Sequence, residues 1–417
     1  MRTTPASPPR RRSVVGTTAA VAAMTAIGLS AGSGSASAGA AAEAQAQPRL
    51  SGGTCARGWT GPKSYTAKQQ LLARRPDGGV PNGVASEPAF SRDSRANRYV
   101  AYTSTATDIA VPVTPGRRNV FVAVRTGRVT KNANHWRLGR SDLVSVAPGG
   151  VAADGDSWGA SISGWSGGRD QARGARLLAF LSTATNLTAD GNPGGTGAFI
   201  RKVGGGGIAR VNAPGAATGV AVSGDSKYVY VSTDLGLFLW HAGKVRRLLT
   251  GGGISSPSTT FNGAQAAFER DGVVWTIRRA GGRRRITEGH HPQADGGDMS
   301  NGRRRGLVRS ITFTRAGGAY RAETAKAKIR VKRFGNTQAP PASNAGGSAI
   351  AFGNGVHACL EVELIDRTRR RGGYSIPQGQ CPAGQGTVTD VSVSTRYNYL
   401  AFSCSGGALF LHYVGPK

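Results

Sequence analysis

The sequence has few of the side chains from which enzymes build polar active sites. Its 417 residues include 22 Asp and Glu and six His. A His-Glu-x-x-His zinc motif is absent, and the glycine run at 204–207 lacks the lysine of a phosphate-binding loop. Beyond the N-terminal region, no stretch is apolar over the ~20 residues that a membrane-spanning helix needs. We therefore expect no cofactor, no metal and no transmembrane segment in the mature chain.

Long helices are also disfavoured, because glycine is abundant. The chain has 63 Gly, about twice the usual ~7% share, and each Gly inside a helix costs about 1 kcal/mol. The glycines follow no Gly-X-Y period, which excludes collagen. What remains is a turn-rich chain with short elements, and this predicts an all-β protein.

The first 38 residues have the order of a secretory signal peptide. Four Arg and no acid precede a small-residue apolar run at 14–29, and Ala36-Ser37-Ala38 offers a cleavage site. The Arg triplet at 10–12 resembles a twin-arginine signal, and an ordinary Sec signal or a retained anchor is the alternative. Residues 39–54 predict a disordered leader. We expect an exported protein, extracellular, in the cell wall or periplasmic, with its folded domain at 55–417.

A repeat runs through the rest of the chain. Seven short runs end in, or contain, an aromatic residue and have the pattern of the same strand; they lie at 99–102, 177–180, 228–231, 266–268, 310–313, 349–352 and 399–402. After the first interval, which holds a polar insertion at 131–141, they recur every 38 to 50 residues. This is the period of a β-propeller blade, about 40–50 residues.

Each run is preceded by one short strand and a turn and is followed by one or two more strands. Four strands joined by Gly, Asp, Asn and Pro turns form an antiparallel meander, and such meanders bury both faces when they stack around an axis. We predict one propeller of seven blades, or six if residues 292–334 are an insertion. The last unit lacks a fourth strand, and residues 66–73 are expected to supply it and close the ring.

The repeat resembles that of TolB-like (WD-repeat-like) β-propellers. The similarity rests on residues 89–91, 98–109 and 119–122 and on 178–187 with 189–192. It departs at residues 92–95, Arg-Asp-Ser-Arg, where that family usually has Asp-Gly. The resemblance implies a propeller, usually of six blades, with exported or periplasmic binding and scaffold roles. It implies no shared catalytic residues.

Four cysteines in an exported chain indicate two disulfides. They are Cys55, Cys359, Cys381 and Cys404, and they allow three connectivities. We favour Cys359–Cys381, across the sixth blade and its exit loop, together with Cys55–Cys404 as a staple of the N-terminal arm. The alternative is Cys381–Cys404 with Cys55–Cys359.

Two groups of polar residues are candidates for metal binding. The densest has Glu288, His290, His291, Asp295 and Asp298. Adjacent His residues on a regular strand point to opposite faces, so we interpret this cluster as a polar inter-blade loop. The Asp-Gly pairs at 154–156 and 190–192 fit turns better than calcium sites.

The charge is the one functional hint in the composition. Lys and Arg number 53, giving a net charge of +31, and removing the four Arg of residues 1–38 would leave +27. Basic clusters lie at 117–118, 246–247, 278–279, 283–285, 303–305 and 369–371. Most fall in or beside turns, so we expect them on rims and outer faces. They favour non-specific polyanion binding, and solvated rims without a ligand are the simpler explanation.

The expected first strands decide between binding and catalysis. Those at 89–91, 160–163 and 220–223 carry small and apolar residues, whereas an enzyme would place acids, His or Tyr in a central channel. We therefore expect a monomeric, non-enzymatic binding or scaffold module for a protein or an anionic envelope polymer. The alternative is a hydrolase or lyase that acts on an anionic glycan in the channel.

Overall fold

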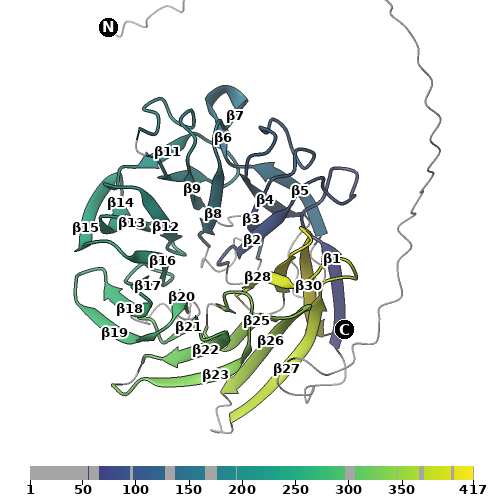
Figure 1. The fold of residues 1–417 in the computed structure, drawn as a ribbon, viewed down its shortest axis with the longest axis vertical. Coiled ribbons are helices and arrows are strands. Elements are labelled where there is room, and N and C mark those ends of the chain that lie inside the picture. Colours follow the sequence, from purple (N-terminus) through teal and green to yellow (C-terminus); the bar gives the residue numbers. More distant parts are fainter. Residues whose placement is uncertain are drawn as a thin grey trace, which may run out of the picture. The chain divides into compact units, whose positions relative to one another are not determined.

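The computed structural model describes Cys55 and residues 65–93, 97–126, 137–164, 176–193, 195–295, 306–325, 327–344, 346–365, 371–395 and 399–416. Within these residues, seven four-stranded antiparallel sheets form the blades of a propeller (Figure 1). The seven-blade prediction is confirmed. The six-blade alternative is wrong, because the segment that resembled an insertion forms a complete blade between two others.

The strands of the first three blades are as follows. Blade 1 holds β2 (Ala85–Phe90), β3 (Tyr99–Ser104), β4 (Asn119–Thr126) and β5 (Arg137–Leu143). Blade 2 holds β8 (Ser157–Ile162), β9 (Leu177–Ser182), β10 (Gly197–Lys202) and β11 (Ile208–Val211). Blade 3 holds β12 (Ala217–Val222), β13 (Tyr228–Thr233), β14 (Gly236–His241) and β15 (Lys244–Thr250). Between blades 1 and 2 lies a small ribbon of β6 (Val146–Ala147), the 3₁₀ turn η1 (Pro148–Gly150) and β7 (Val151–Ala152).

The remaining blades follow the same order. Blade 4 holds β16 (Ile254–Thr259), β17 (Gln265–Arg270), β18 (Val273–Arg278) and β19 (Arg283–Glu288). Blade 5 holds β20 (His290–Ala294), β21 (Ser310–Arg315), β22 (Gly318–Glu323) and β23 (Arg330–Asn336). Blade 6 holds β24 (Ala342–Ser343), β25 (Ala349–Asn354), β26 (His357–Ile365) and β27 (Arg371–Gln380). Blade 7 holds β28 (Val388–Val393), β29 (Tyr399–Cys404), β30 (Leu409–Pro416) and β1 (Tyr65–Leu71).

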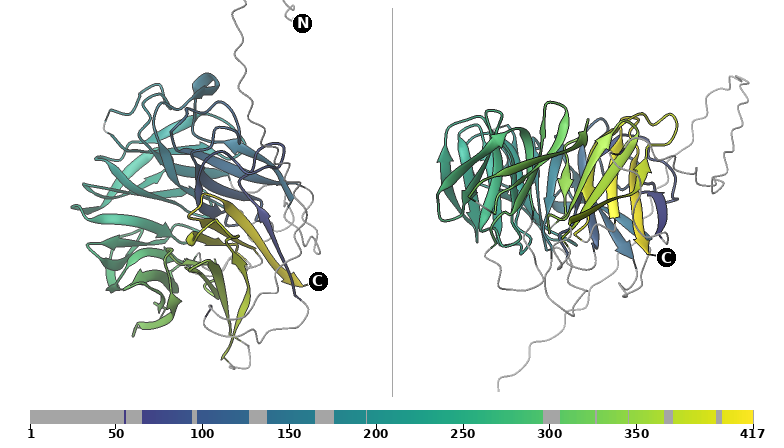
Figure 2. Two further views of the ribbon diagram at one scale, coloured as in Figure 1. Left: turned by 45° about the vertical axis from the view of Figure 1, so that its right-hand side comes forward. Right: turned by 90° about the horizontal axis from the view of Figure 1, so that it is seen from below.

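The ring closes through the two ends of the described chain. Strand β1 pairs antiparallel with β30, from Tyr65 opposite Pro416 to Leu71 opposite Phe410, which confirms the predicted closing strand. The first strands of neighbouring blades contact one another around the axis, and β2 of blade 1 contacts β28 of blade 7 (Figures 1 and 2). Closure covers the sheet edge that β30 would otherwise expose.

The core lies between the blades. Every residue of β9 and β29 is buried, because these second strands are packed on both faces. The repeat aromatics are at most 1% exposed: Tyr102, Phe180, Tyr230, Phe268, Phe313, Phe352 and Phe402. Burying one such side chain stabilises the fold by roughly 1.5–3 kcal/mol.

One turn device recurs where the first strand of each blade leads into the second. A side-chain oxygen accepts the N–H of the residue that starts or adjoins the second strand, at 2.9–3.3 Å, in all seven blades. The acceptors are Ser91, Ser163, Ser223, Thr260, Asp295, Asn344 and Ser394. The backbone N–H of each acceptor residue bonds back across the turn. Short polar side chains suit this role because they satisfy turn backbone groups locally.

The favoured disulfide pairing is wrong. The bridges are Cys55–Cys359 and Cys381–Cys404, with Cα–Cα distances of 5.7 and 5.8 Å, which was the alternative. Cys359 packs with Phe334 at the interface of blades 5 and 6, whereas Cys381 and Cys404 pack at the interface of blades 6 and 7. Cys359 and Cys381 therefore face opposite sides of blade 6 and cannot meet.

Candidate functional site

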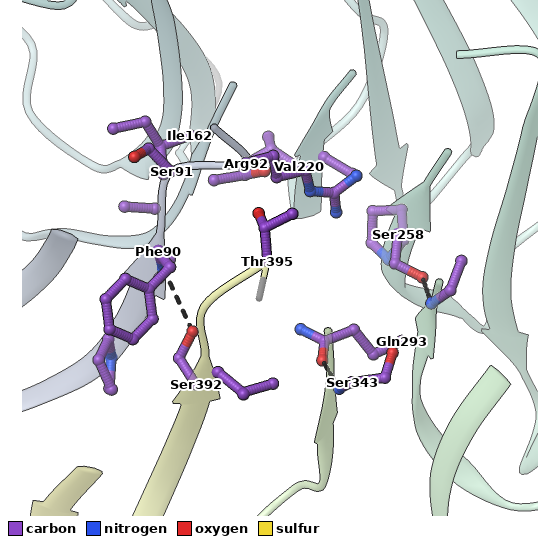
Figure 3. Close-up of a pocket in the computed structure, with 18 residues that line it drawn as sticks. Phe90, Ser91, Arg92, Ile162, Val220, Ser258, Gln293, Ser343, Ser392 and Thr395 are labelled. Carbon is purple, nitrogen blue, oxygen red and sulfur yellow. Dashed lines mark hydrogen bonds between the residues drawn. The ribbon is translucent and has the colours of Figure 1, made fainter. Parts of the chain in front are cut away.

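A central cavity of about 210 Å³ lies where the first strands of all seven blades converge (Figure 3). Its wall is made of small, apolar and hydroxyl side chains: Pro88, Ala89, Phe90, Ser91, Arg92, Ala160, Ser161, Ile162, Val220, Ala221, Pro257, Ser258, Gln293, Ala294, Ser343, Ser392, Val393 and Thr395. The first strands at 89–91, 160–163 and 220–223 therefore surround the axis as expected.

Four polar side chains of this wall hold neighbouring blades together. Each accepts the backbone N–H of the next blade's first strand: Ser161 Oγ from Val222 (3.0 Å), Ser258 Oγ from Ala294 (2.9 Å), Gln293 Oε1 from Ser343 (2.9 Å) and Ser392 Oγ from Phe90 (3.2 Å). Blades 1, 3 and 6 have Ala at the equivalent position. These oxygens act structurally, because they satisfy backbone donors between blades.

Among the described residues of the cavity wall, Arg92 is the one that carries a charge. It follows β2 in blade 1, and its guanidinium donates a hydrogen bond to the carbonyl of Thr259 in blade 4. Burial lowers the pKa of the guanidinium to about 10, so Arg92 is still a cation at neutral pH. Figure 3 shows its side chain reaching over Val220, on the far side of the cavity from Gln293.

Two more donors face the same space. The amide oxygen of Gln293 accepts the Ser343 N–H, and its amide nitrogen lies on the cavity side (Figure 3). The side chain of Thr395 extends into the middle of the space between Phe90 and Ser258 (Figure 3). The backbone of Thr395 is held by two hydrogen bonds. Its carbonyl accepts one from the side-chain amide of Asn344, and its N–H donates one to the side-chain oxygen of Asn97.

Glycines allow the turns beside Arg92 to pack closely. The Arg92 N–H bonds to the carbonyl of Ser163 at 3.2 Å, and the Gly164 N–H bonds to that of Gly224 at 2.8 Å. A Cβ at Gly164 would lie 2.2 Å from the Arg92 backbone, and one at Gly224 would lie 2.0 Å from the ring of Phe261. Larger residues at these two positions would push the turns apart and displace Arg92.

The His and acid cluster does not converge. Only Gly289 separates β19 from β20, so the His pair starts a strand and the predicted inter-blade loop is wrong. His290 Nδ1 is 2.8 Å from the Glu269 carboxylate, and the His291 N–H donates to the same group at 3.1 Å. His291 has a φ of 51° in a β-bulge.

Asp295 lies apart from the His pair, in the turn after β20, where it accepts the N–H groups of Arg309 and Ser310. Asp298 lies outside the described residues. Within the part of the chain that the structure describes, no group of three or more His, Cys, Asp or Glu side chains could hold a metal ion.

The two Asp-Gly segments serve turns. Asp154 accepts the N–H and the hydroxyl of Thr185, and Asp156 accepts the Arg118 N–H at 3.1 Å. Asn192 donates to the carbonyls of Ser182 and Gly195. The carboxylates of Asp154 and Asp156 and the amide nitrogen of Asn192 are thus engaged with the chain itself, as the turn interpretation predicts.

A second candidate surface runs over the outer strands of blades 3, 4 and 5. Nine basic residues there are all exposed: Lys244, Arg246 and Arg247 on β15, Arg283, Arg284 and Arg285 on β19, and Arg330, Lys332 and Arg333 on β23. We call this set the outer basic strands. Across these three strands, which the structure describes in full, only Glu288 is acidic, 3.7 Å from Arg285.

The placement of the basic clusters was only partly predicted. The residues at 246–247 and 283–285 lie within fourth strands, on the outside of the ring as expected (Figure 1), and those at 117–118 and 278–279 lie in or beside turns. The clusters at 303–305 and 369–370 lie outside the described residues. Sequence reasoning missed Arg92 as a cavity residue, although the signal was present, because Arg92 begins the departure from the repeat pattern at 92–95.

The described residues contain no helix that is long and apolar enough to cross a membrane. No protein-family model matches the chain, and no curated protein matches it. The fold therefore stands on the structure itself: the chain forms a seven-bladed β-propeller stapled by two disulfides.

Proposed function

We propose that the protein is an exported, TolB-like propeller that serves as a non-enzymatic binding or scaffold module, with an anionic envelope polymer as its preferred partner over a neutral protein. The observation that carries the proposal is the outer basic strands. Nine exposed cations lie on the outer strands of three consecutive blades, and cations gathered in this way attract polyanions through counterion release.

Several of these cations lie over aromatic rings. The guanidinium of Arg247 lies 5.4 Å from the ring of Phe238, and that of Arg283 lies 5.6 Å from the ring of Trp275. The Lys332 ammonium lies 4.6 Å from the ring of Phe334. These contacts restrict the long side chains on the strand surface. Less side-chain conformational entropy is therefore lost when a polymer binds.

The cavity wall favours binding over the alternative of glycan hydrolysis or cleavage. General acid–base catalysis needs an Asp, Glu, His, Lys or Tyr within reach of the substrate. The residues that line the described cavity include none of these. Four polar side chains of this wall already join neighbouring blades.

Export is supported by the disulfides and the N-terminal sequence. Two disulfide bridges are typical of proteins that fold in an oxidising compartment. The proposed signal at 1–38 and leader at 39–54 lie outside the described residues.

The test measures binding of the protein to a polyanion, polyphosphate, at several salt concentrations, with neutral dextran as reference. A triple variant, Lys244→Gln, Arg283→Gln and Arg330→Gln, removes one cation from each outer basic strand. The matched control, Arg117→Gln, Arg140→Gln and Lys202→Gln, removes three exposed cations from blades 1 and 2. We expect the first triple to lower the slope of log affinity against log salt by about 2–3, and the control to leave it nearly unchanged.

Equal losses in the two triples would show that only the total charge matters, and would contradict a localised site. Release of reducing ends from an anionic glycan by the wild-type protein would instead support the enzymatic alternative.

A further inference from the structure

Among the described residues that line the central cavity, Arg92 is the one cation, and the other side chains of the wall are hydroxyl, amide, small or apolar. Among the residues that the structure describes, no carboxylate contacts the guanidinium of Arg92, whose side chain makes one hydrogen bond, to the Thr259 carbonyl. An arginine has five N–H donors in a planar fork. Several of these donors are therefore available to a ligand in the cavity.

Removing an arginine from water without an anion is costly, and a bound anion offsets that cost. The lowered pKa of Arg92, whose cause is burial, is consistent with this deficit. The Gln293 amide nitrogen and the Thr395 side chain face the same space (Figure 3). Arg92, the Gln293 amide nitrogen and the Thr395 hydroxyl can all donate hydrogen bonds, which suits an oxygen-rich anionic group.

Apolar side chains form part of the wall. Phe90, Ile162, Val220 and Pro257 contribute apolar surface. A cavity of 210 Å³ exceeds the ~150 Å³ that accepts benzene in another protein. One cation balances one negative charge, whereas a phosphate monoester carries about −1.5 to −2.

We propose that this cavity binds a small monocarboxylate, the carboxylate being held by Arg92 with Thr395. The carboxylate belongs either to a free acid or to the C-terminus of a peptide. This site is separate from the outer basic strands, so its success or failure is independent of polyanion binding.

The test is isothermal titration calorimetry on the full, oxidised chain with benzoate as the probe. We expect saturable binding at one site per chain. Arg92→Gln is expected to weaken binding at least tenfold, because it removes the charged half of a fork–carboxylate pair. The exposed Arg330→Gln, which removes the same charge from an outer strand, is the control and should bind as the wild type does.

Two further titrations fix the ligand class. Benzyl alcohol, which is neutral and of similar size, should bind at least tenfold more weakly than benzoate, and inorganic phosphate should bind more weakly too. N-acetylphenylalanine distinguishes the sources: tighter binding than benzoate identifies a peptide C-terminus, and weaker binding identifies a free acid.

The proposal is overturned by the absence of saturable heat up to about 10 mM benzoate, by equal binding of benzyl alcohol or phosphate, or by wild-type affinity in Arg92→Gln. If Arg92→Gln does not fold, Thr395→Val decides, because it removes a hydroxyl at constant shape. Benzoate affinity should then fall several-fold, and an unchanged affinity would refute the assignment.

Discussion

At the scale of single residues, each blade has one side-chain oxygen that accepts a backbone N–H in the turn between its first and second strands. The acceptor that closes the turn after the first strand is Ser in four blades and Thr, Asp or Asn in the other three. All four residue types place an oxygen two or three bonds from the backbone, which explains why they are interchangeable here. Asp295 is the exception in charge, since it is buried and ionisable.

Asp295 makes stability depend on pH. Burial raises the pKa of its carboxyl to about 6, against the opposing effect of hydrogen bonds from Arg309 and Ser310. The folded pKa lies above the unfolded value of 3.8, so the stabilisation of the protonated form is complete below pH 4 and is lost as the pH rises through 6. Asn has nearly the same shape as Asp and does not ionise. Asn344 already accepts the corresponding hydrogen bond in blade 6.

We therefore predict that Asp295→Asn gains stability relative to the wild type by about 2 kcal/mol between pH 4 and pH 7. Urea unfolding at pH 4, 5, 6 and 7 measures this difference. The exposed Asp271→Asn makes the same charge change and should follow the wild-type curve. Parallel curves for Asp295→Asn and the wild type would show that the carboxyl does not titrate in this range.

At the scale of strands and sheets, the alternation of side chains along a strand determines which cysteines can pair. Successive residues of a strand face opposite sides, so Cys359 on β26 lies against blade 5, while Ala358 and Leu360 lie against blade 7. Cys381 follows β27 and meets Cys404 at the end of β29. Spacing along the chain carries no information about which face a cysteine takes when the strand register is unknown.

The two bridges should differ in their contribution. Cys381–Cys404 has a sequence separation of 23, and Cys55–Cys359 has one of 304. In the chain-entropy account, removal of the first by Cys381→Ser and Cys404→Ser lowers the free energy of unfolding by ~3 kcal/mol, and removal of the second by ~5–6 kcal/mol. Chemical denaturation of the two double variants measures both, and each serves as the control for the other.

Proteolysis without reductant, followed by mass spectrometry, tests the pairing directly. A peptide that links Cys359 to Cys381 would contradict the structure and restore the pairing that the sequence favoured.

At the scale of the whole molecule, one strand closes the ring. Seven residue pairs join β1 to β30, and the side chain of Gln69 adds two bonds with the backbone of Gln380 in blade 6. Without β1, strand β30 would be an open edge of the kind that pairs with other chains.

We predict that a chain starting at residue 72 loses about 5 kcal/mol of stability, from some seven backbone hydrogen bonds, and self-associates. Its control starts at residue 52 and keeps β1. Both chains carry Cys359→Ser, and the control also carries Cys55→Ser, so that they differ only in the closing segment. Light scattering and thermal unfolding compare them, and a stable monomer without β1 would mean that the ring does not need this strand.

Much of the architecture follows from the sequence alone. Blade number, strand positions, the buried aromatics and the closing strand are local properties, because they depend on alternation along a strand, on turn residues such as Ser223 and on a repeat length. The proposed signal peptide and the TolB-like resemblance stay predictions.

Only the tertiary structure decided which cysteines pair, which cations share the outer basic strands and that Arg92 lies in the cavity. These properties join residues far apart in sequence, and they depend on the face that each side chain takes once the sheets are registered and the ring is closed. Arg92 sits in a turn of blade 1, yet its hydrogen-bond partner is in blade 4. Nothing local in the chain encodes a contact across the axis.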